Sequence, residues 1–182
     1  MVGLHVAHAV TVLRRATAAD VPVLAPFAAE AFTAAFGHLY QPADLALFLG
    51  QWRTRKAYRD TLAIPAMRVQ LAEVDGRLAG YAQIALGDGF EERPEPQPAR
   101  PVLLSQLYCA ADMTGRGVGA ALMDWAIAEA RTWHADALQL SVFSENFGAQ
   151  RFYRRYGFEH VADIDFWVGN HRDDEFLYEL AL

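Results

Sequence analysis

The stretch TGRGVG at residues 114–119 follows a run of strand-forming residues at 102–109 and begins an apolar helical pattern that reaches about Trp133. The first amides of a helix have no carbonyl partners within the helix and lie at the positive end of its dipole. A glycine-rich turn at this place predicts an anion site, because the backbone can approach a phosphate closely. A flexible loop is the alternative that the glycines alone leave open. The residues concerned are Thr114, Gly115, Arg116, Gly117, Val118 and Gly119, among which the arginine adds a positive charge.

A second informative stretch, NFGAQRFYRRYGF, occupies residues 146–158. At 3.6 residues per turn, Asn146, Ala149 and Tyr153 share one face of a helix, and the phenol lies about two turns from the amide. The small Ala149 leaves room between the two polar side chains for a slender ligand. Phe152 points elsewhere, so we expect it in the core.

Taken together, LYCAADMTGRGVGAAL (107–122) and VFSENFGAQRFYRRYGF (142–158) resemble the GNAT superfamily of acyl-CoA N-acyltransferases. The phosphate motif of that family, Q/R-x-x-G-x-G/A, is matched at Gly117 and Gly119, whereas Thr114 replaces the usual Gln or Arg. The resemblance extends from about residue 10 to the C-terminus. The later family motif, N-x-x-A-x-x-F-Y, is matched at Asn146, Ala149, Phe152 and Tyr153.

The resemblance implies an N-acetyltransferase that uses acetyl-CoA as co-substrate and releases coenzyme A. A primary amine would attack the thioester carbonyl directly, through a tetrahedral intermediate. The backbone amides of Leu107, Tyr108 and Cys109 are expected to hold the pantetheine arm, with the Cys109 amide as oxyanion donor. Tyr153 is expected to protonate the departing thiolate.

The general base is not assigned by the sequence. Many members of the family carry a carboxylate on the strand before the glycine turn, and the corresponding residue here is Leu103. An amine with a pKa near 10 is mostly charged at neutral pH, so a base or a chain of waters has to remove a proton. Candidates for the general base are Glu30, His38, Glu91 and His171. The sequence singles out none of them.

Two further stretches, AFTAAFGHLYQPADLALFL (31–49) and DFWVGNHRDDEFLYEL (165–180), resemble the bacterial branch of the family that acetylates polyamines such as spermidine. A polyamine or another small cation is therefore an expected amine acceptor. The acidic net charge of the chain and the presence of Glu91 and Glu92 in a proline-rich loop agree with this hypothesis.

Other interpretations remain open. One alternative is a catalytically inactive acyl-CoA-binding module, because the absence of the strand carboxylate is consistent with lost chemistry. Gly115, Gly117 and Ala120 also satisfy the dinucleotide motif G-x-G-x-x-G/A, with Asp136 about 20 residues later. Only one βαβ unit is predicted around them, which disfavours a nicotinamide-dinucleotide fold. Covalent catalysis by Cys109 is disfavoured because a lone strand cysteine more often serves packing.

Composition indicates one globular domain over residues 1–182, because 53% of the 182 residues are hydrophobic and 21% are charged. The net charge of −6 leaves no broad cationic surface, so nucleic acid is not expected as a partner. A single cysteine suits a reducing cytoplasm, and neither a signal sequence nor a membrane span is predicted. A homodimer is left open.

The predicted element order is β-α-α-β-β-β-α-β-α-β-β, an α/β fold with a mixed, mostly antiparallel sheet and helices on both faces. The pattern from Thr17 to Asp20 predicts the start of the first helix, which ends near Phe36, and Pro42 begins a second that reaches about Leu62. The strands are predicted at 10–16, 67–74, 77–86, 102–109, 137–143, 158–168 and 175–181, the later helices at 117–133 and 147–156, and an irregular loop at 87–101.

Overall fold

A single seven-stranded sheet runs through residues 10–182, the part of the chain that the computed structural model describes. Its order is β1-β2-β3-β4-β5-β7-β6, with β4 and β5 parallel and the other neighbouring strands antiparallel. The strands are β1 (Thr11–Arg15), β2 (Met67–Val74), β3 (Arg77–Leu86), β4 (Pro101–Cys109), β5 (Ala137–Phe143), β6 (Glu159–Val168) and β7 (His171–Ala181). The predicted mixed sheet is confirmed, and this order differs from the parallel sheet of a dinucleotide-binding fold.

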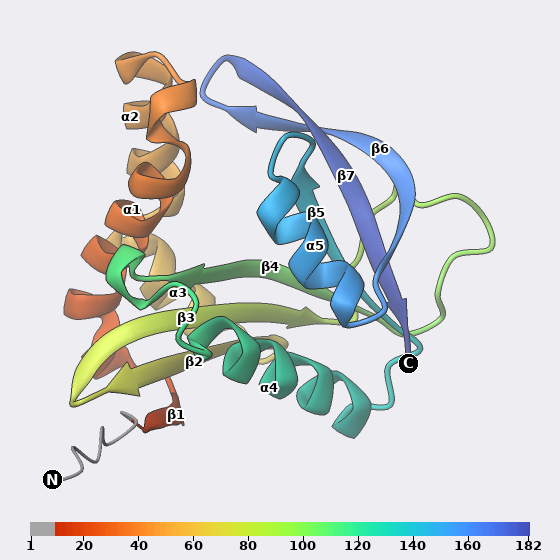
Figure 1. Ribbon diagram of the computed structural model, residues 1–182, viewed down its shortest axis with the longest axis horizontal. Coiled ribbons are helices and arrows are strands. Elements are labelled where there is room, and N and C mark those ends of the chain that lie inside the picture. Colours follow the sequence, from red (N-terminus) through yellow and green to blue (C-terminus); the bar gives the residue numbers. More distant parts are fainter. Residues whose placement is uncertain (1–9) are drawn as a thin grey trace, which may run out of the picture.

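Helices cover both faces of the sheet (Figure 1). On one face, α4 buries Val118 and Leu122 against β3 and β4. On the other face, α1 and α3 bury Leu24 and Tyr58. Each strand can serve both cores because its successive side chains point to opposite faces. The helices are α1 (Val21–Phe36), α2 (Pro42–Trp52), α3 (Arg55–Ala63), α4 (Val118–Thr132) and α5 (Phe147–Arg155).

The predicted helix from Pro42 to about Leu62 is wrong, because two helices occupy this segment. Arg53 leaves the helical conformation at φ −119° and ψ 35°, and Thr54 adopts an extended one. The Thr54 hydroxyl then accepts a hydrogen bond from the Ala57 amide at 3.1 Å, which satisfies one free donor at the start of α3. The break turns Arg53 inward, so that 8% of its surface remains exposed.

The last strand begins four residues earlier than predicted, at His171, and forms a hairpin with β6. The tip of this hairpin docks on the start of α2, where the Asn170 amide donates to the Asp44 carboxylate at 2.8 Å. Gly169 allows this approach: it has φ +59°, and a Cβ there would lie 2.6 Å from the Asp44 Cα. The contact holds the start of α2 against the tip of the β6–β7 hairpin (Figure 1).

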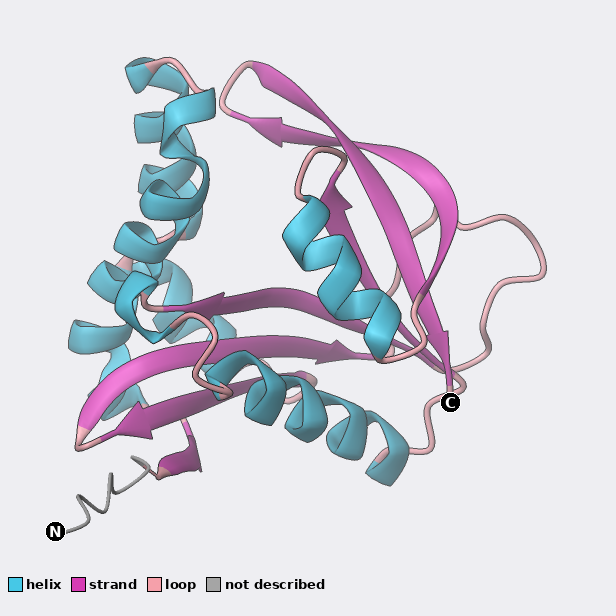
Figure 2. Cartoon of the chain, in the orientation of Figure 1, coloured by secondary structure: helices cyan, strands magenta, loops and turns pink. Residues whose placement is uncertain are grey.

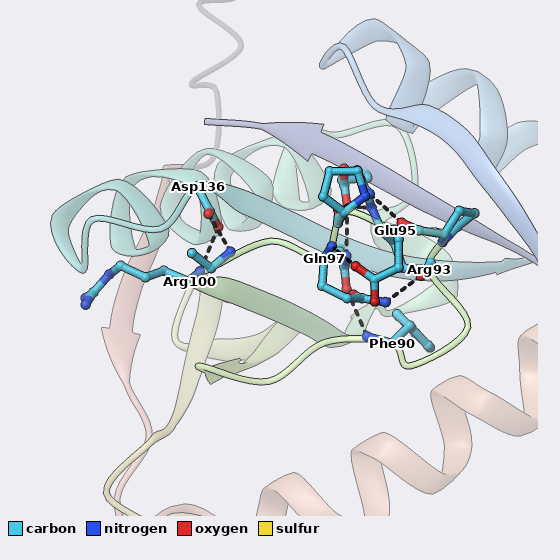
Figure 3. Close-up of polar contacts among 11 residues, drawn as sticks. Phe90, Arg93, Glu95, Gln97, Arg100 and Asp136 are labelled. Atoms are coloured by element: carbon cyan, nitrogen blue, oxygen red, sulfur yellow. Dashed lines mark hydrogen bonds and ion pairs between the residues drawn. The ribbon is translucent and has the colours of Figure 1, made fainter.

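The proline-rich loop 87–100 is irregular, as predicted, and is held by several polar contacts (Figure 3). The Arg93 guanidinium donates to the Glu179 carboxylate from Nε at 3.0 Å and from Nη2 at 2.8 Å. The Asp136 carboxylate accepts the amides of Ala99 and Arg100 at 2.7 and 2.9 Å. Asp136 thus anchors a loop, which is a structural role and not that of a ribose ligand.

The stretch Ala18–Leu39 is long and apolar enough to cross a membrane by length and composition alone. In this fold it contains α1, whose Val21, Leu24 and Ala28 are buried in the core against the sheet. A core helix meets the same criteria, and the fold accounts for the apolar face of α1. The Thr17 amide donates to the Asp20 carboxylate at 2.7 Å just before α1, as the capping pattern predicts.

Candidate functional site

The strands β4 and β5 pair over three residues and then diverge (Figure 2). Their parallel pairing ends at Leu103 and Gln139, although β4 continues to Cys109 and β5 to Phe143. A cavity of about 380 Å³ lies where the strands have separated, lined by 104–109 of β4 and 140–143 of β5. The divergence therefore exposes backbone and side chains at the centre of the sheet.

Backbone N–H groups of β4 face this opening at alternate residues. The Ala110 amide donates to the Ala79 carbonyl on β3 at 2.8 Å. Because successive residues of a strand point their N–H groups to opposite sides, those of Cys109 and Leu107 point away from β3, and that of Tyr108 points toward it. Of the three amides predicted to hold a pantetheine arm, those of Leu107 and Cys109 therefore face the opening, and that of Tyr108 does not. Tyr108 nevertheless belongs to the lining of the cavity.

The glycine turn lies at one end of the cavity, where Thr114 belongs to the lining. Gly117 has φ 84° and precedes α4, whose first internal hydrogen bond is donated by the Ala121 amide to the Gly117 carbonyl at 3.0 Å. The amides of Val118 and Gly119 therefore have no partner within the helix. Gly115 and Gly117 lie in open space with positive φ, so a ligand can approach the backbone here.

The second motif is divided between the cavity and the core. Asn146 caps α5, because its side-chain oxygen accepts the Ala149 amide at 3.1 Å, and both residues line the cavity. Phe152 packs against Tyr156, with ring centroids 5.2 Å apart, and belongs to the core between α5 and α4. Phe152 thus has the packing role expected from its helical position.

Tyr153 and Cys109 both line the cavity, and burial shapes the chemistry of each. Burial raises the pKa of Tyr153 above its usual value, and the nearby Tyr108, Glu175 and Cys109 raise it further. Burial also raises the pKa of the Cys109 thiol to about 11. The phenol therefore keeps its proton at neutral pH, and the thiol is not activated as a nucleophile.

Glu175 on β7 also lines the cavity, and sequence reasoning did not identify it. Its Oε2 atom is buried and has no hydrogen-bond partner in residues 10–182. Burial raises the pKa of this carboxyl group to about 7, and the neighbouring Asp173 contributes to the rise, which Ser141 opposes. A carboxyl group that titrates near neutrality in a cavity is suited to accept a proton.

The base candidates taken from the sequence lie elsewhere. Leu103 precedes the point of divergence, where β4 still pairs with β5, and is not part of the cavity lining. Glu30 and Glu91 line two separate surface depressions. His38 is exposed, and His171 pairs with Asp173 at 3.2 Å while 43% of its side chain remains exposed.

The chain matches the Acetyltransferase (GNAT) family over residues 28–158 and therefore belongs to it. An uncharacterized N-acetyltransferase from Mycobacterium tuberculosis is 32% identical over 158 residues, 87% of this chain and 95% of its own length. The spermine/spermidine N(1)-acetyltransferase of Bacillus subtilis is 29% identical over 93 residues, which are 50% of this chain and 59% of that protein. The expectation of an N-acyltransferase enzyme is confirmed.

The fold agrees with that of a solved N-acetyltransferase. The crystal structure of PaiA N-acetyltransferase from Thermoplasma acidophilum, in complex with coenzyme A, superposes with a TM-score of 0.76 at 16% identity. The match covers 95% of this chain and 99% of the other. The two proteins thus share a fold over nearly their whole described length.

Proposed function

We propose that this protein transfers an acetyl group from acetyl-CoA to a primary amine in the cavity between β4 and β5. The observation that carries the proposal is that Tyr153 and Glu175 reach one cavity from the two faces of the sheet. Tyr153 belongs to α5, which packs with Phe176 and Tyr178 of β7. Glu175 alternates with these two residues along β7, so it projects from the opposite face.

The coenzyme side of the site is formed by α4 and α5. The unpartnered amides of Val118 and Gly119 and the open backbone at Gly117 suit the phosphates of acetyl-CoA. The amides of Leu107 and Cys109 suit the carbonyl groups of a pantetheine arm that lies in the place β5 has left. Asn146 and Ala149 would border this arm. These residues fit acetyl-CoA, which supplies the acetyl group as a thioester.

Glu175 is the residue best placed to deprotonate the amine. Near pH 7 about half of a group with a pKa of about 7 is ionised, so a carboxylate is available to accept a proton. The partial burial of the site lowers the pKa of an incoming ammonium group. The difference between this pKa and that of Glu175, which opposes the transfer of the proton to the carboxylate, is thereby reduced. A carboxylate from β7 would thus replace the one that β4 lacks at Leu103.

The Cys109 amide and the Tyr153 hydroxyl would act on the other two reacting atoms. The Cys109 N–H would donate a hydrogen bond to the carbonyl oxygen as negative charge develops on it. The Tyr153 hydroxyl, which burial keeps protonated, would donate its proton to the departing sulfur. Direct attack needs no covalent enzyme intermediate, in keeping with the raised pKa of the Cys109 thiol.

Turnover separates this proposal from an inactive acyl-CoA-binding module. Wild-type protein and the double variant Tyr153→Phe/Glu175→Gln would be incubated with acetyl-CoA and a panel of polyamines, aminoglycosides, amino acids and peptides. The release of free coenzyme A and the acetylated amine would be measured together. We expect transfer by the wild type to at least one amine and loss of most of it in the variant. Coenzyme binding without transfer to any amine would favour the inactive module.

A polyamine is one candidate acceptor, and it is favoured by the partial similarity to the Bacillus subtilis spermine/spermidine enzyme. Glu91, which motivated this prediction together with Glu92, lines a depression near Pro101 and Gln139 and not the cavity between β4 and β5. The acidic groups that do line or adjoin the cavity are Glu175 and Asp173. A cytoplasmic location and a homodimer remain predictions from the sequence.

A further inference from the structure

Arg53, in the break between α2 and α3, is a buried cation that lines the cavity between β4 and β5. It is 8% exposed, and its Nε atom is buried without a hydrogen-bond partner. Its Nη1 atom makes one long hydrogen bond, at 3.4 Å, to the carbonyl of Trp52. None of the arginine ion pairs within residues 10–182 involves Arg53.

Aromatic rings surround this guanidinium group. Its Cζ lies 5.1 Å from the ring centroid of Phe48, 5.5 Å from that of Phe32 and 5.8 Å from that of Tyr108. Such rings attract a cation and offset part of its desolvation. Ring faces do not replace the acceptors that the five N–H groups of a guanidinium need in its plane, so the hydrogen-bonding capacity of Arg53 is largely unused.

The nearest polar network supplies few of those acceptors: the Tyr108 hydroxyl faces the guanidinium group, but a hydroxyl offers a single oxygen to five N–H groups. The Gln106 side-chain oxygen already accepts hydrogen bonds from the hydroxyls of Tyr58 and Tyr81, each at 2.8 Å. Glu175 lines the same cavity, yet it forms no ion pair with Arg53. The cavity therefore presents an unpaired cation and an unpaired carboxyl group at two separate places.

We infer that Arg53 binds a carboxylate of the acceptor, so that the substrate is a primary amine that also carries a carboxylate. A guanidinium group matches a carboxylate in two parallel hydrogen bonds, and a buried arginine is stabilised when such a partner arrives. The amine of the same molecule would lie at Glu175. This inference rests on the proposed acetyl transfer and makes it more specific, because it favours an amino acid or related compound over a polyamine.

The test compares acceptors that differ in one end group. Leucine is matched with 3-methylbutylamine, and β-alanine and 4-aminobutyrate are each matched with the alkylamine and the diamine of equal chain length. The quantity measured is kcat/KM at saturating acetyl-CoA. In at least one matched set the kcat/KM of the carboxylate compound is expected to exceed that of every matched amine by roughly 10- to 150-fold, the range for a hydrogen-bonded charge.

Variants then assign this preference to Arg53. Arg53→Met is expected to reduce the ratio of kcat/KM for the carboxylate compound to kcat/KM for the alkylamine to about one, mainly by raising the KM of the carboxylate compound. Arg53→Lys is expected to retain part of the preference for the carboxylate compound. Arg55→Met removes an exposed arginine two residues away and serves as the matched control, with the wild-type ratio. If Arg53→Met does not fold, inhibition of the wild type by butyrate, competitive with the acceptor and not with acetyl-CoA, provides the second measurement.

Two failures are distinguishable. The inference is overturned if alkylamines or diamines are acetylated as efficiently as every carboxylate compound. It is also overturned if folded Arg53→Met keeps the wild-type ratio of kcat/KM values. Either result leaves the proposed acetyltransferase activity intact. Absence of butyrate inhibition would have the same meaning where the methionine variant is unfolded. Absence of transfer to every amine tested overturns the proposed function, and the inference with it.

Discussion

Tyr153 and Glu175 line a single cavity, although Tyr153 belongs to α5 and Glu175 projects from the face of β7 that is opposite to α5. The divergence of β4 and β5 beyond Leu103 makes this meeting possible, because it opens the sheet between its two faces. An acid and a base on opposite sides of one opening suit a reaction in which one group loses a proton and another gains one.

Replacing Tyr153 by Phe is expected to lower kcat by roughly 10²- to 10⁴-fold, because the ring is retained while proton donation is lost. The KM values should change little, as expected for an interaction made in the transition state. Single-turnover transfer measured by rapid quench reports this step directly. Tyr156→Phe is the control, since this tyrosine directly follows the same helix and its phenol donates to the Ala120 carbonyl at 3.3 Å. Wild-type transfer by Tyr153→Phe would mean that water protonates the thiolate.

Replacing Glu175 by Gln is expected to lower kcat/KM by roughly 10²- to 10⁴-fold and to remove an acid limb near pH 7 from its pH profile. In the wild type that limb follows the carboxyl group with a pKa of about 7, whose titratable neighbours are Asp173 on the same strand and the phenols of Tyr40, Tyr108 and Tyr153. Asp174→Asn alters the adjacent exposed carboxylate and should keep both the rate and the limb. Persistence of the limb in Glu175→Gln would assign it to another group.

The same substitution should stabilise the fold at high pH. The pKa of Glu175 rises from 4.5 to about 7 on folding, so its contribution is fully present below pH 4.5 and is lost as the pH rises through 7. Glu175→Gln does not ionise, and its free energy of unfolding relative to the wild type should rise by up to roughly 3 kcal/mol between pH 4 and pH 8. Urea denaturation at the two pH values measures this difference. A difference independent of pH would contradict the buried, titrating carboxyl group.

Replacing Gly117 by Val is expected to weaken coenzyme A binding by roughly 10-fold or more, as when a hydrogen bond to a charged group is lost. The φ of 84° is unfavourable for a β-branched residue, and the added side chain would enter the space above the first amides of α4. Gly76→Val is the matched control: that glycine has φ +72°, lies in open space and belongs to the β2–β3 turn. Calorimetric titration of both variants with coenzyme A separates the effect of backbone strain from loss of the phosphate site. Equal affinities of the two variants for coenzyme A would place the phosphates elsewhere.

Coenzyme A is expected to raise the melting temperature, because a ligand that binds the native state stabilises it by mass action. At a concentration 100 times its Kd, the gain of about 2.7 kcal/mol corresponds to roughly 5–10 °C for a domain of this size. Differential scanning calorimetry with coenzyme A and, separately, NAD measures the effect. A shift produced by NAD and not by coenzyme A would contradict the assignment of the glycine turn.

The local elements could be predicted because their signals lie within a few residues of each other. Asp75 and Gly76 adopt the positive φ values of a tight hairpin turn, 52° and 72°. Gly157 closes α5 at φ 91°, and Phe158 is buried just beyond it. The sequence did not predict the break at Arg53, because Leu45, Phe48, Leu49 and Trp52 recur at helical spacing and suggest one continuous buried face. In the structure this face ends before Trp52, which is 52% exposed.

The sequence by itself determined the order of the elements, the glycine turn before α4 and the helix that joins Asn146 to Tyr153, since these depend on backbone propensity and spacing along the chain. Only the tertiary structure decided that β4 and β5 separate, that Glu175 of an acidic strand faces the opening, and that Arg53 is buried without a carboxylate partner in residues 10–182. The alternation along β7 places Glu175 on the face opposite Tyr178, but it does not say whether that face meets water or a cavity. Burial arises from segments distant in the chain, and it is burial that gives Glu175 a pKa of about 7 and leaves Arg53 in need of an anion.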